Sequence, residues 1–227
     1  MEAGLTIYND TDNIQIDSTY KNLILYAKGT AVTTTSFVGT SLSYVDILAT
    51  RPNSVCCMQS VGGAAFSCIS FESGGNVYHR IFTKRTGQSV KYYLFSDQIP
   101  GGSTFGLEVY DANGFRVFQA TEKYMVITAA VTSFKLIEAT GIQLSQTIGA
   151  GSRAISISNR VLGKRTVAIP TPTGTIIYAF SRFITMCTTR EGFADFEYFQ
   201  YASGTGSVGY EGPYELSALS IDLDRVE

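Results

Sequence analysis

The feature that most constrains this chain is the alternation of apolar and polar residues at every second position, which recurs along almost its whole length. Such alternation is typical of a strand with one buried face. Short alternating runs rich in aromatic, β-branched and Thr residues include Val55–Ser60, Val77–Thr83 and Val90–Phe95. Polar turns separate the runs, and none has the length and period of a long helix. The sequence therefore predicts an all-β protein, an antiparallel β-sandwich.

Composition supports a folded domain and excludes several classes of protein. With 44% hydrophobic and 16% charged residues, the chain has enough apolar material for a core, which excludes wholesale disorder. A formal net charge of −2 argues against a nucleic-acid binder. The amino-terminal residues resemble no secretory signal, and no run is apolar for long enough to form a membrane-spanning helix. We therefore expect synthesis in the cytoplasm, with no nucleic-acid partner and no membrane insertion.

An internal repeat is the most informative motif. The segment Gly4–Asn9 (GLTIYN) is matched 102 residues later by Gly106–Asp111 (GLEVYD). After a one-residue gap, Asn13–Ile16 corresponds to Gly114–Val117. Each copy predicts a strand, a polar turn and a returning strand. In the second copy, Asn-Gly at Asn113 supplies the positive φ that tight hairpins need.

The repeat leaves two interpretations of the domain organisation. Lys21, Leu23 and Leu25 also match Lys123, Met125 and Ile127, which favours duplication of a unit of about 100 residues. The units would then be residues 1–103 and 104–227, joined at the Pro- and Gly-rich segment Ile99–Ser103. The alternative is a single all-β domain, 1–227, that contains two similar hairpins.

The repeated hairpin resembles one found in small β-rich virion proteins of tailed bacteriophages, which are encoded among tail-tip and tail-fibre genes. The residues that carry this resemblance are Gly4, Leu5, Tyr8, Gly106, Leu107, Tyr110, Asn113 and Gly114. The first copy departs from the motif, with Asn13 where the turn glycine is expected. The resemblance implies a virion protein of the tail, assembled in several copies and with no known catalytic role.

These observations predict a non-enzymatic structural component of a tailed-phage virion, associated with the tail tip or tail fibre. Its partners would be other tail or virion proteins and further copies of itself, as a trimer or hexamer. The residues predicted at an interface are Tyr198, Tyr201, Tyr210 and Tyr214, because Tyr offers a large contact area at low entropic cost. The alternative is that these rings pack inside the sandwich. Rival functions are binding of a host-surface glycan or receptor, head decoration and glycan cleavage.

Few residues suggest chemistry, and we expect no catalytic site, cofactor or metal site. His79 is the only histidine, and we expect it to be a half-exposed residue of an alternating strand. Asp195 and Glu197 share one face of a strand at a spacing that permits a glycosidase pair, or simply a polar strand face. Arg153 and the basic stretch Arg160–Arg165 would contact acidic residues, such as those of the tail Asp222–Glu227, or lie in a solvated loop.

Two further hairpins are expected from turns between alternating runs. Lys84–Gln88 would join Val77–Thr83 to Val90–Phe95. A turn at Gly62 would place Cys57 opposite Cys68, within reach of a disulfide, although two separate buried thiols fit a reducing cytosol better. Cys56 would point to the opposite face from Cys57.

Overall fold

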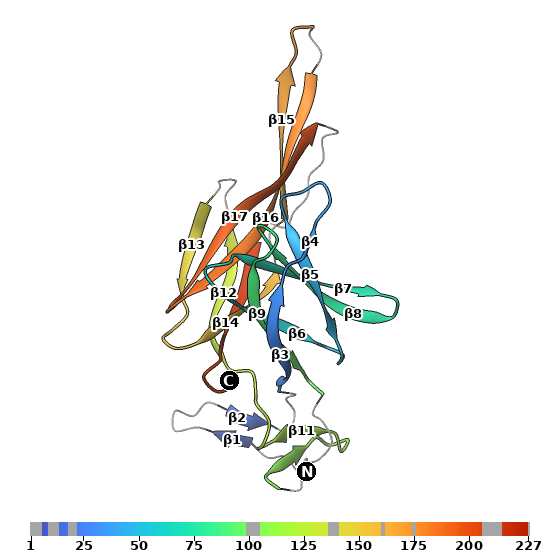
Figure 1. Ribbon diagram of the computed structural model, residues 1–227. Coiled ribbons are helices and arrows are strands. Elements are labelled where there is room, and N and C mark those ends of the chain that lie inside the picture. Colours follow the sequence, from blue (N-terminus) through green and yellow to red (C-terminus); the bar gives the residue numbers. More distant parts are fainter. Residues whose placement is uncertain are drawn as a thin grey trace.

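The fold is an antiparallel β-sandwich, which confirms the predicted fold class. The computed structural model describes residues 6–8, 14–17, 22–98, 105–135, 141–159, 162–173, 176–205 and 215–226, and in these ranges there is no helix, and so none that could span a membrane. Its eighteen strands are shown in Figure 1. They are β1 (Thr6–Tyr8), β2 (Ile14–Asp17), β3 (Ile24–Val32), β4 (Thr35–Ser36), β5 (Ser43–Ala49), β6 (Val55–Ser60), β7 (Phe66–Ser73), β8 (Asn76–Thr83), β9 (Ser89–Ser96), β10 (Glu108–Tyr110), β11 (Arg116–Gln119), β12 (Ile127–Lys135), β13 (Gly141–Thr147), β14 (Arg153–Asn159), β15 (Leu162–Pro170), β16 (Ile176–Arg190), β17 (Phe193–Thr205) and β18 (Glu215–Asp222).

Two sheets form the sandwich. The six-stranded sheet has the order β12-β18-β14-β6-β9-β3. The eight-stranded sheet has the order β13-β17-β16-β7-β8-β5-β4, and β15 also pairs with β16. The main core lies between the sheets, where alternate side chains of each strand meet.

Each sheet is divided cleanly between the two halves of the sequence. Strands that precede residue 103 occupy one side of each sheet, and strands that follow it occupy the other. The sheets continue across this boundary where Met58 pairs with Ile155 and Phe66 pairs with Cys187. The core is continuous as well, because one buried cluster contains Phe66 and Phe196 together. The two units expected from the sequence therefore share one core, rather than each enclosing its own.

Two of the expected hairpins are wrong. The strands β8 and β9, on either side of Lys84–Gln88, belong to different sheets, and so do β6 and β7. Both connections carry the chain from one sheet to the other. Cys57 consequently lies opposite Tyr93, not Cys68, and no disulfide links any of Cys56, Cys57, Cys68 and Cys187. The expectation for the neighbouring thiols is confirmed, because Cys56 faces the main core and Cys57 faces a second cluster on the other side of β6.

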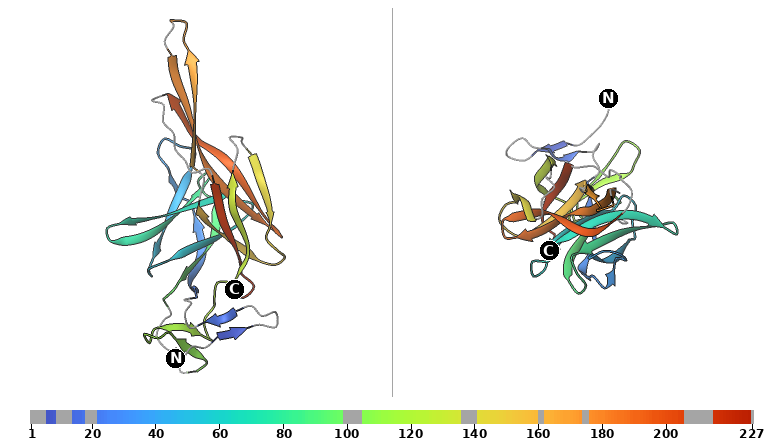
Figure 2. Two further views of the ribbon diagram at one scale, coloured as in Figure 1. Left: turned by 180° about the vertical axis from the view of Figure 1, so that it is seen from behind. Right: turned by 90° about the horizontal axis from the view of Figure 1, so that it is seen from above.

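This second cluster lies on the outer face of the six-stranded sheet. Cys57, Tyr93 and Phe95 are buried there beneath residues 22–25, residues 123–126 and the segment Leu223–Val226. Beyond this end of the sandwich lie the two small hairpins, β1–β2 and β10–β11 (Figures 1 and 2).

At the opposite end, β15 and the first part of β16 project from the sandwich as a long ribbon, which we call the arm (Figures 1 and 2). Ile169 and Ile176 near its tip are 48% and 54% exposed. The stretch Arg160–Arg165 was interpreted as a solvated loop or an ionic contact. From Leu162 onward it is part of strand β15 and not a loop, while residues 160 and 161 lie outside the described residues. The ionic contact stays a prediction.

Candidate interaction surface

The turn of hairpin β10–β11 is built by an aspartate and a glycine. The Asp111 carboxylate accepts hydrogen bonds from the backbone N–H groups of Asn113 (2.9 Å) and Phe115 (2.8 Å). The backbone N–H of Gly114 donates to the Asp111 carbonyl at 3.0 Å, and Gly114 has a φ of 79°. Only glycine adopts this conformation without strain, which confirms the expectation of positive φ at the Asn-Gly pair. In the described residues, Asn53 is the only non-glycine with positive φ, so Asn113 does not share it.

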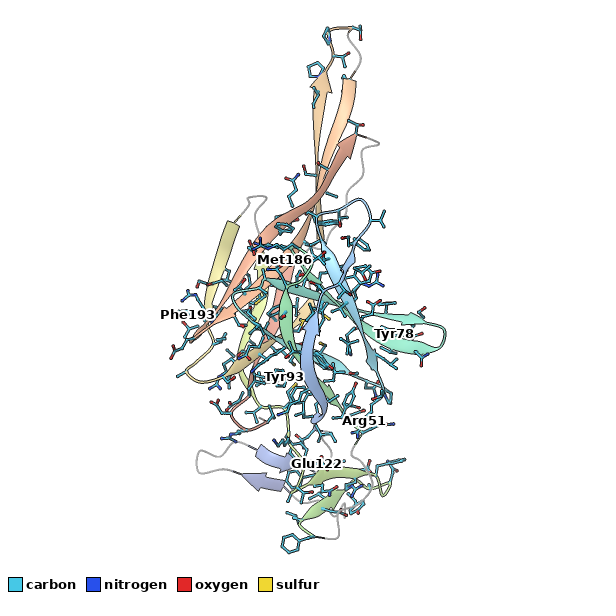
Figure 3. The ribbon with its side chains drawn as sticks, in the orientation of Figure 1. Arg51, Tyr78, Tyr93, Glu122, Met186 and Phe193 are labelled. Atoms are coloured by element: carbon cyan, nitrogen blue, oxygen red, sulfur yellow. The ribbon has the colours of Figure 1, made fainter. Side chains whose placement is uncertain are left out.

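The hairpin has one buried face of its own. Val109 and Val117 are 6% and 1% exposed, and Phe118 packs against them. The Phe118 ring stacks on Tyr124 with ring centroids 5.0 Å apart. Tyr124 in turn accepts a hydrogen bond from the backbone N–H of Gln119 at 2.5 Å. These contacts fix the hairpin to residues 120–124, the segment that contains Glu122, which Figure 3 labels.

A polar pair spans the two strands. The Arg116 guanidinium lies 2.7 Å from the Glu108 carboxylate, and the Tyr110 hydroxyl donates a hydrogen bond to the same carboxylate. This hydrogen bond raises the pKa of Tyr110. The charges of Glu108 and Arg116 are therefore matched within the hairpin, and the Asp111 carboxylate is held by backbone N–H groups.

The rest of the hairpin surface is apolar and open to solvent. Phe105 is 85% exposed, Phe115 63%, Tyr110 50% and Leu107 47%. Among the aromatic side chains whose exposure the structure describes, no other is exposed to this degree. We call the surface formed by these four residues, three aromatic and one leucine, the aromatic hairpin. Leu107 and Tyr110 belong to the motif found in the sequence, whereas Phe105 and Phe115 lie within the repeat but were not selected as site residues.

The first copy of the repeat forms the matching hairpin β1–β2. Gly4 and Leu5 lie outside the described residues, but Tyr8 pairs with Ile14 just as Tyr110 pairs with Arg116. β1 and β2 each lie 102 residues before their counterparts β10 and β11, so the one-residue gap expected from the sequence is wrong. Counted from the paired strands, Asp12 corresponds to Gly114, and Asn13 does not.

The tyrosines predicted at an interface are not equivalent. Tyr198 is 1% exposed within the main core, so it offers no area to a partner. Tyr201 is half-buried and borders an open polar groove of about 460 Å³. The groove is lined by Gly39, Thr40, Ser41, Gln200, Tyr201, Ala202 and Ser203. Tyr210 and Tyr214 lie outside the described residues.

The carboxylates considered for glycan cleavage are held in separate ion pairs. Asp195 bonds Arg190 at 2.7 Å and Ser145 at 2.5 Å, and the Arg190 hydrogen bond lowers the pKa of Asp195. Glu197 lies 2.6 Å from the Lys84 ammonium. Each carboxylate therefore has a structural partner, and neither lines the groove beside Tyr201.

His79 is buried rather than half-exposed. Its side chain is 1% exposed, and its two ring nitrogens lie 2.9 Å from the hydroxyls of Ser70 and Ser54. The Ser54 hydroxyl also bonds the Tyr26 hydroxyl at 2.7 Å. Burial of an imidazole is tolerated here because both nitrogens have hydrogen-bond partners.

A second polar cavity, of about 360 Å³, lies between β6, β14 and the β16–β17 turn. Arg153 and Arg190 line it, and both are already paired with carboxylates. Arg153 contacts Asp222 at 2.6 Å and Asp224 at 3.3 Å, which confirms one of the ionic contacts expected with the acidic tail. Within the described ranges, no three His, Cys, Asp or Glu side chains gather into a group that could hold a metal ion.

Comparison of the chain with protein-family models, curated proteins and solved structures finds no match.

Proposed function

We propose that this chain is a non-enzymatic structural component of a tailed-phage virion, associated with the tail tip or tail fibre, which assembles through the aromatic hairpin. The observation that carries the proposal is the concentration of exposed aromatic rings on one hairpin, and this hairpin is the segment that resembles phage tail proteins. Exposed aromatic anchors that cluster in one place are typical of protein interfaces.

The occupant that we propose for this surface is a second copy of the chain. Glu108 and Arg116 neutralise each other on the hairpin, so the Asp111 carboxylate is the one net charge of residues 105–119 and repulsion between two copies is small. The net charge of −2 adds little long-range repulsion. Closed symmetric assembly then predicts a discrete trimer or hexamer, in keeping with the symmetry of a tail axis.

Light scattering coupled to size exclusion tests this contact. The wild type is expected to give one oligomeric mass at about 100 µM, a concentration at which even weak specific contacts are populated. The double variant F105S/F115S is expected to weaken association about 100-fold or more, because two buried aromatic anchors would be lost. Val38, 94% exposed and far from the hairpin in sequence, provides the control V38S, which should keep the wild-type mass. A monomeric wild type, or an unchanged mass for F105S/F115S, would contradict the proposal.

The groove beside Tyr201 favours a second candidate function, binding of a host-surface glycan. Its hydroxyl and amide groups can hydrogen-bond a sugar, and a tyrosine ring offers a stacking surface. Calorimetric titration with host polysaccharide would give heat with the wild type and much less with Y201A. Absence of heat with the wild type would remove this candidate.

A further inference from the structure

The two small hairpins share one register. Thr6 pairs with Asp17, and Glu108 pairs with Gln119; Ile7 pairs with Ile16, and Val109 pairs with Phe118. In both hairpins the register then shifts at the next residue, Tyr8 or Tyr110. Because a bulge is a specific local feature of a strand pair, its recurrence at the same place indicates a common origin.

The correspondence continues into the six-stranded sheet. The β3–β9 pairing shifts register between Leu25 and Ala27, and the β12–β18 pairing shifts between Ile127 and Ala129. These positions are again 102 residues apart. β3 and β12 also occupy the two opposite edges of this sheet. β3 therefore corresponds to β12, and β9 corresponds to β18.

The eight-stranded sheet repeats the same pattern. β7 and β8 join through a two-residue turn closed by the pair Ser73 and Asn76. β16 and β17 join through a two-residue turn closed by Arg190 and Phe193. The strands of the first half and their counterparts in the second half follow the same chain order and the same sheet order. β5, β6, β7, β8 and β9 correspond to β13, β14, β16, β17 and β18. Among the described strands, only β15, which pairs with β16 in the arm, and the two-residue β4 fall outside this correspondence.

Corresponding segments also contact each other. Ile24 bridges to Tyr124, the Leu25 backbone N–H donates to the Lys123 carbonyl, and the Met125 N–H donates to the Leu23 carbonyl. Leu23 and Met125, which are 102 residues apart, lie opposite each other in this pairing.

Both sheets are likewise joined at their centres by antiparallel pairs between counterpart strands, β6 with β14 and β7 with β16. Antiparallel neighbours are related by a two-fold axis perpendicular to the sheet. The three contacts therefore fit one local two-fold axis through the molecule.

We infer that the chain is a tandem duplication whose two units pair about a local two-fold axis, so that hairpins β1–β2 and β10–β11 are equivalent positions of one docking surface for a second copy of the chain. The docking part rests on the proposed function, whereas the duplication does not. The first hairpin keeps Leu5 and Tyr8 at the places of Leu107 and Tyr110, but has Ala3 and Asn13 at the places of Phe105 and Phe115. The second hairpin thus supplies most of the aromatic area.

Exchange of the hairpins in the full chain tests the duplication. Residues 3–17 are replaced by the sequence of residues 105–119, which has the same length. If the hairpins are equivalent, the melting temperature stays within about 3 °C of the wild type. A control graft that omits Asn113 puts the returning strand one residue out of register and turns its side chains to the wrong faces, so it should lose at least twice as much. Equal losses for both grafts would overturn the duplication.

A rescue experiment tests the docking part separately. The in-register graft is introduced into the F105S/F115S variant, which restores aromatic rings at the first hairpin only. Recovery of the wild-type oligomeric mass is the expected result. A graft that folds but stays monomeric would overturn the equivalence of the two docking positions. A monomeric wild type would overturn the proposed function, and the melting temperatures of the grafts would still decide the duplication.

Discussion

Replacement of Phe66 by alanine is the most direct test of a core shared by the two halves of the chain. Phe66 is fully buried, begins β7 and pairs with Cys187 of β16, at the place where the two halves of the eight-stranded sheet meet. Its ring belongs to the cluster that also contains Leu94 from the first half and Phe196 from the second. Loss of a buried phenyl ring removes its transfer free energy and leaves a cavity, which lowers the free energy of unfolding by about 4 kcal/mol.

For a chain of this length, that loss lowers the melting temperature by about 8 to 16 °C. Urea unfolding followed by far-UV circular dichroism and by tyrosine fluorescence measures the free energy directly. Because the core is continuous, we expect one transition that moves as a whole, with both probes coincident. A loss below about 1 kcal/mol, or two transitions of which only one moves, would refute the shared core. V38A is the control, since this exposed residue should change stability by less than about 0.5 kcal/mol.

Three further predictions concern single sites. Gly114→Ala adds a Cβ in open space at a φ of 79°, so backbone strain alone should lower the free energy of unfolding by about 1 to 2 kcal/mol, whereas N113A should have little effect in the same urea titration. The pKa of Asp195 is lowered by its hydrogen bond from Arg190, so its stabilisation is present above about pH 4, the unfolded pKa, and is lost as the pH falls through the folded value. D195N should therefore be less stable than the wild type at pH 7, with a difference that shrinks as the pH falls below about 4 and is lost below the folded pKa of Asp195; a pH-independent difference would contradict this. Ellman's reagent at pH 8 should modify at most one thiol of the native protein and four after denaturation, and rapid native modification of more than one would be inconsistent with burial. The three protected thiols, whose pKa values are raised, are Cys56, through its hydrogen bond with Cys68, and Cys57 and Cys187, through desolvation.

Strand positions could be predicted from the sequence because alternation records which face of a strand is buried. Val55–Ser60 is a strand with the same bounds in the prediction and in the structure. Val77–Thr83 begins one residue after the start of β8, and Val90–Phe95 is one residue shorter than β9 at each end. For these strands the local pattern and the tertiary packing agree.

The partners of the strands could not be predicted in the same way. A polar turn such as Lys84–Gln88 looks the same whether the chain returns in the same sheet or crosses to the other one. Alternation carries no information on this choice, because it is decided by contacts between residues far apart in the sequence. The disulfide geometry suggested for Cys57 and Cys68 failed for this reason.

Of the two strands of the arm, the sequence predicts β16 as Thr175–Met186 but does not predict β15. Leu162–Pro170 has adjacent basic residues, Lys164 and Arg165, directly after a glycine and ends in proline, which is typical of a loop. Its pairing with β16 forms the arm that projects from the sandwich, and this pairing joins segments that the local sequence pattern does not link. Conversely, the repeated motif located the aromatic hairpin correctly, because Asp111 and Gly114 build its turn through local contacts alone.

Burial of individual polar residues was the least predictable property. His79 was expected to be half-exposed and is buried. Tyr198 was predicted at an interface with packing inside the sandwich as the alternative, and the structure shows the alternative. The hydroxyls of Ser54 and Ser70 that satisfy His79 come from separate segments of the chain. Such long-range partners leave no signal in the sequence near the histidine.

The place of β18 has a consequence for how the chain folds as it is synthesised. β18 lies between β12 and β14, although it follows both of them in the sequence. Until residues 215–222 leave the ribosome, these two strands lack the neighbour that joins them, and the outer cluster still lacks Leu223 and Val226, which are fully buried in the finished fold. The Val226 carbonyl then accepts hydrogen bonds from the ammonium groups of Lys28 and Lys123, one from each half. The six-stranded sheet is therefore completed only after residues 215–222 have been synthesised, and until then the edge of β14 that β18 will cover is open to pairing with another chain.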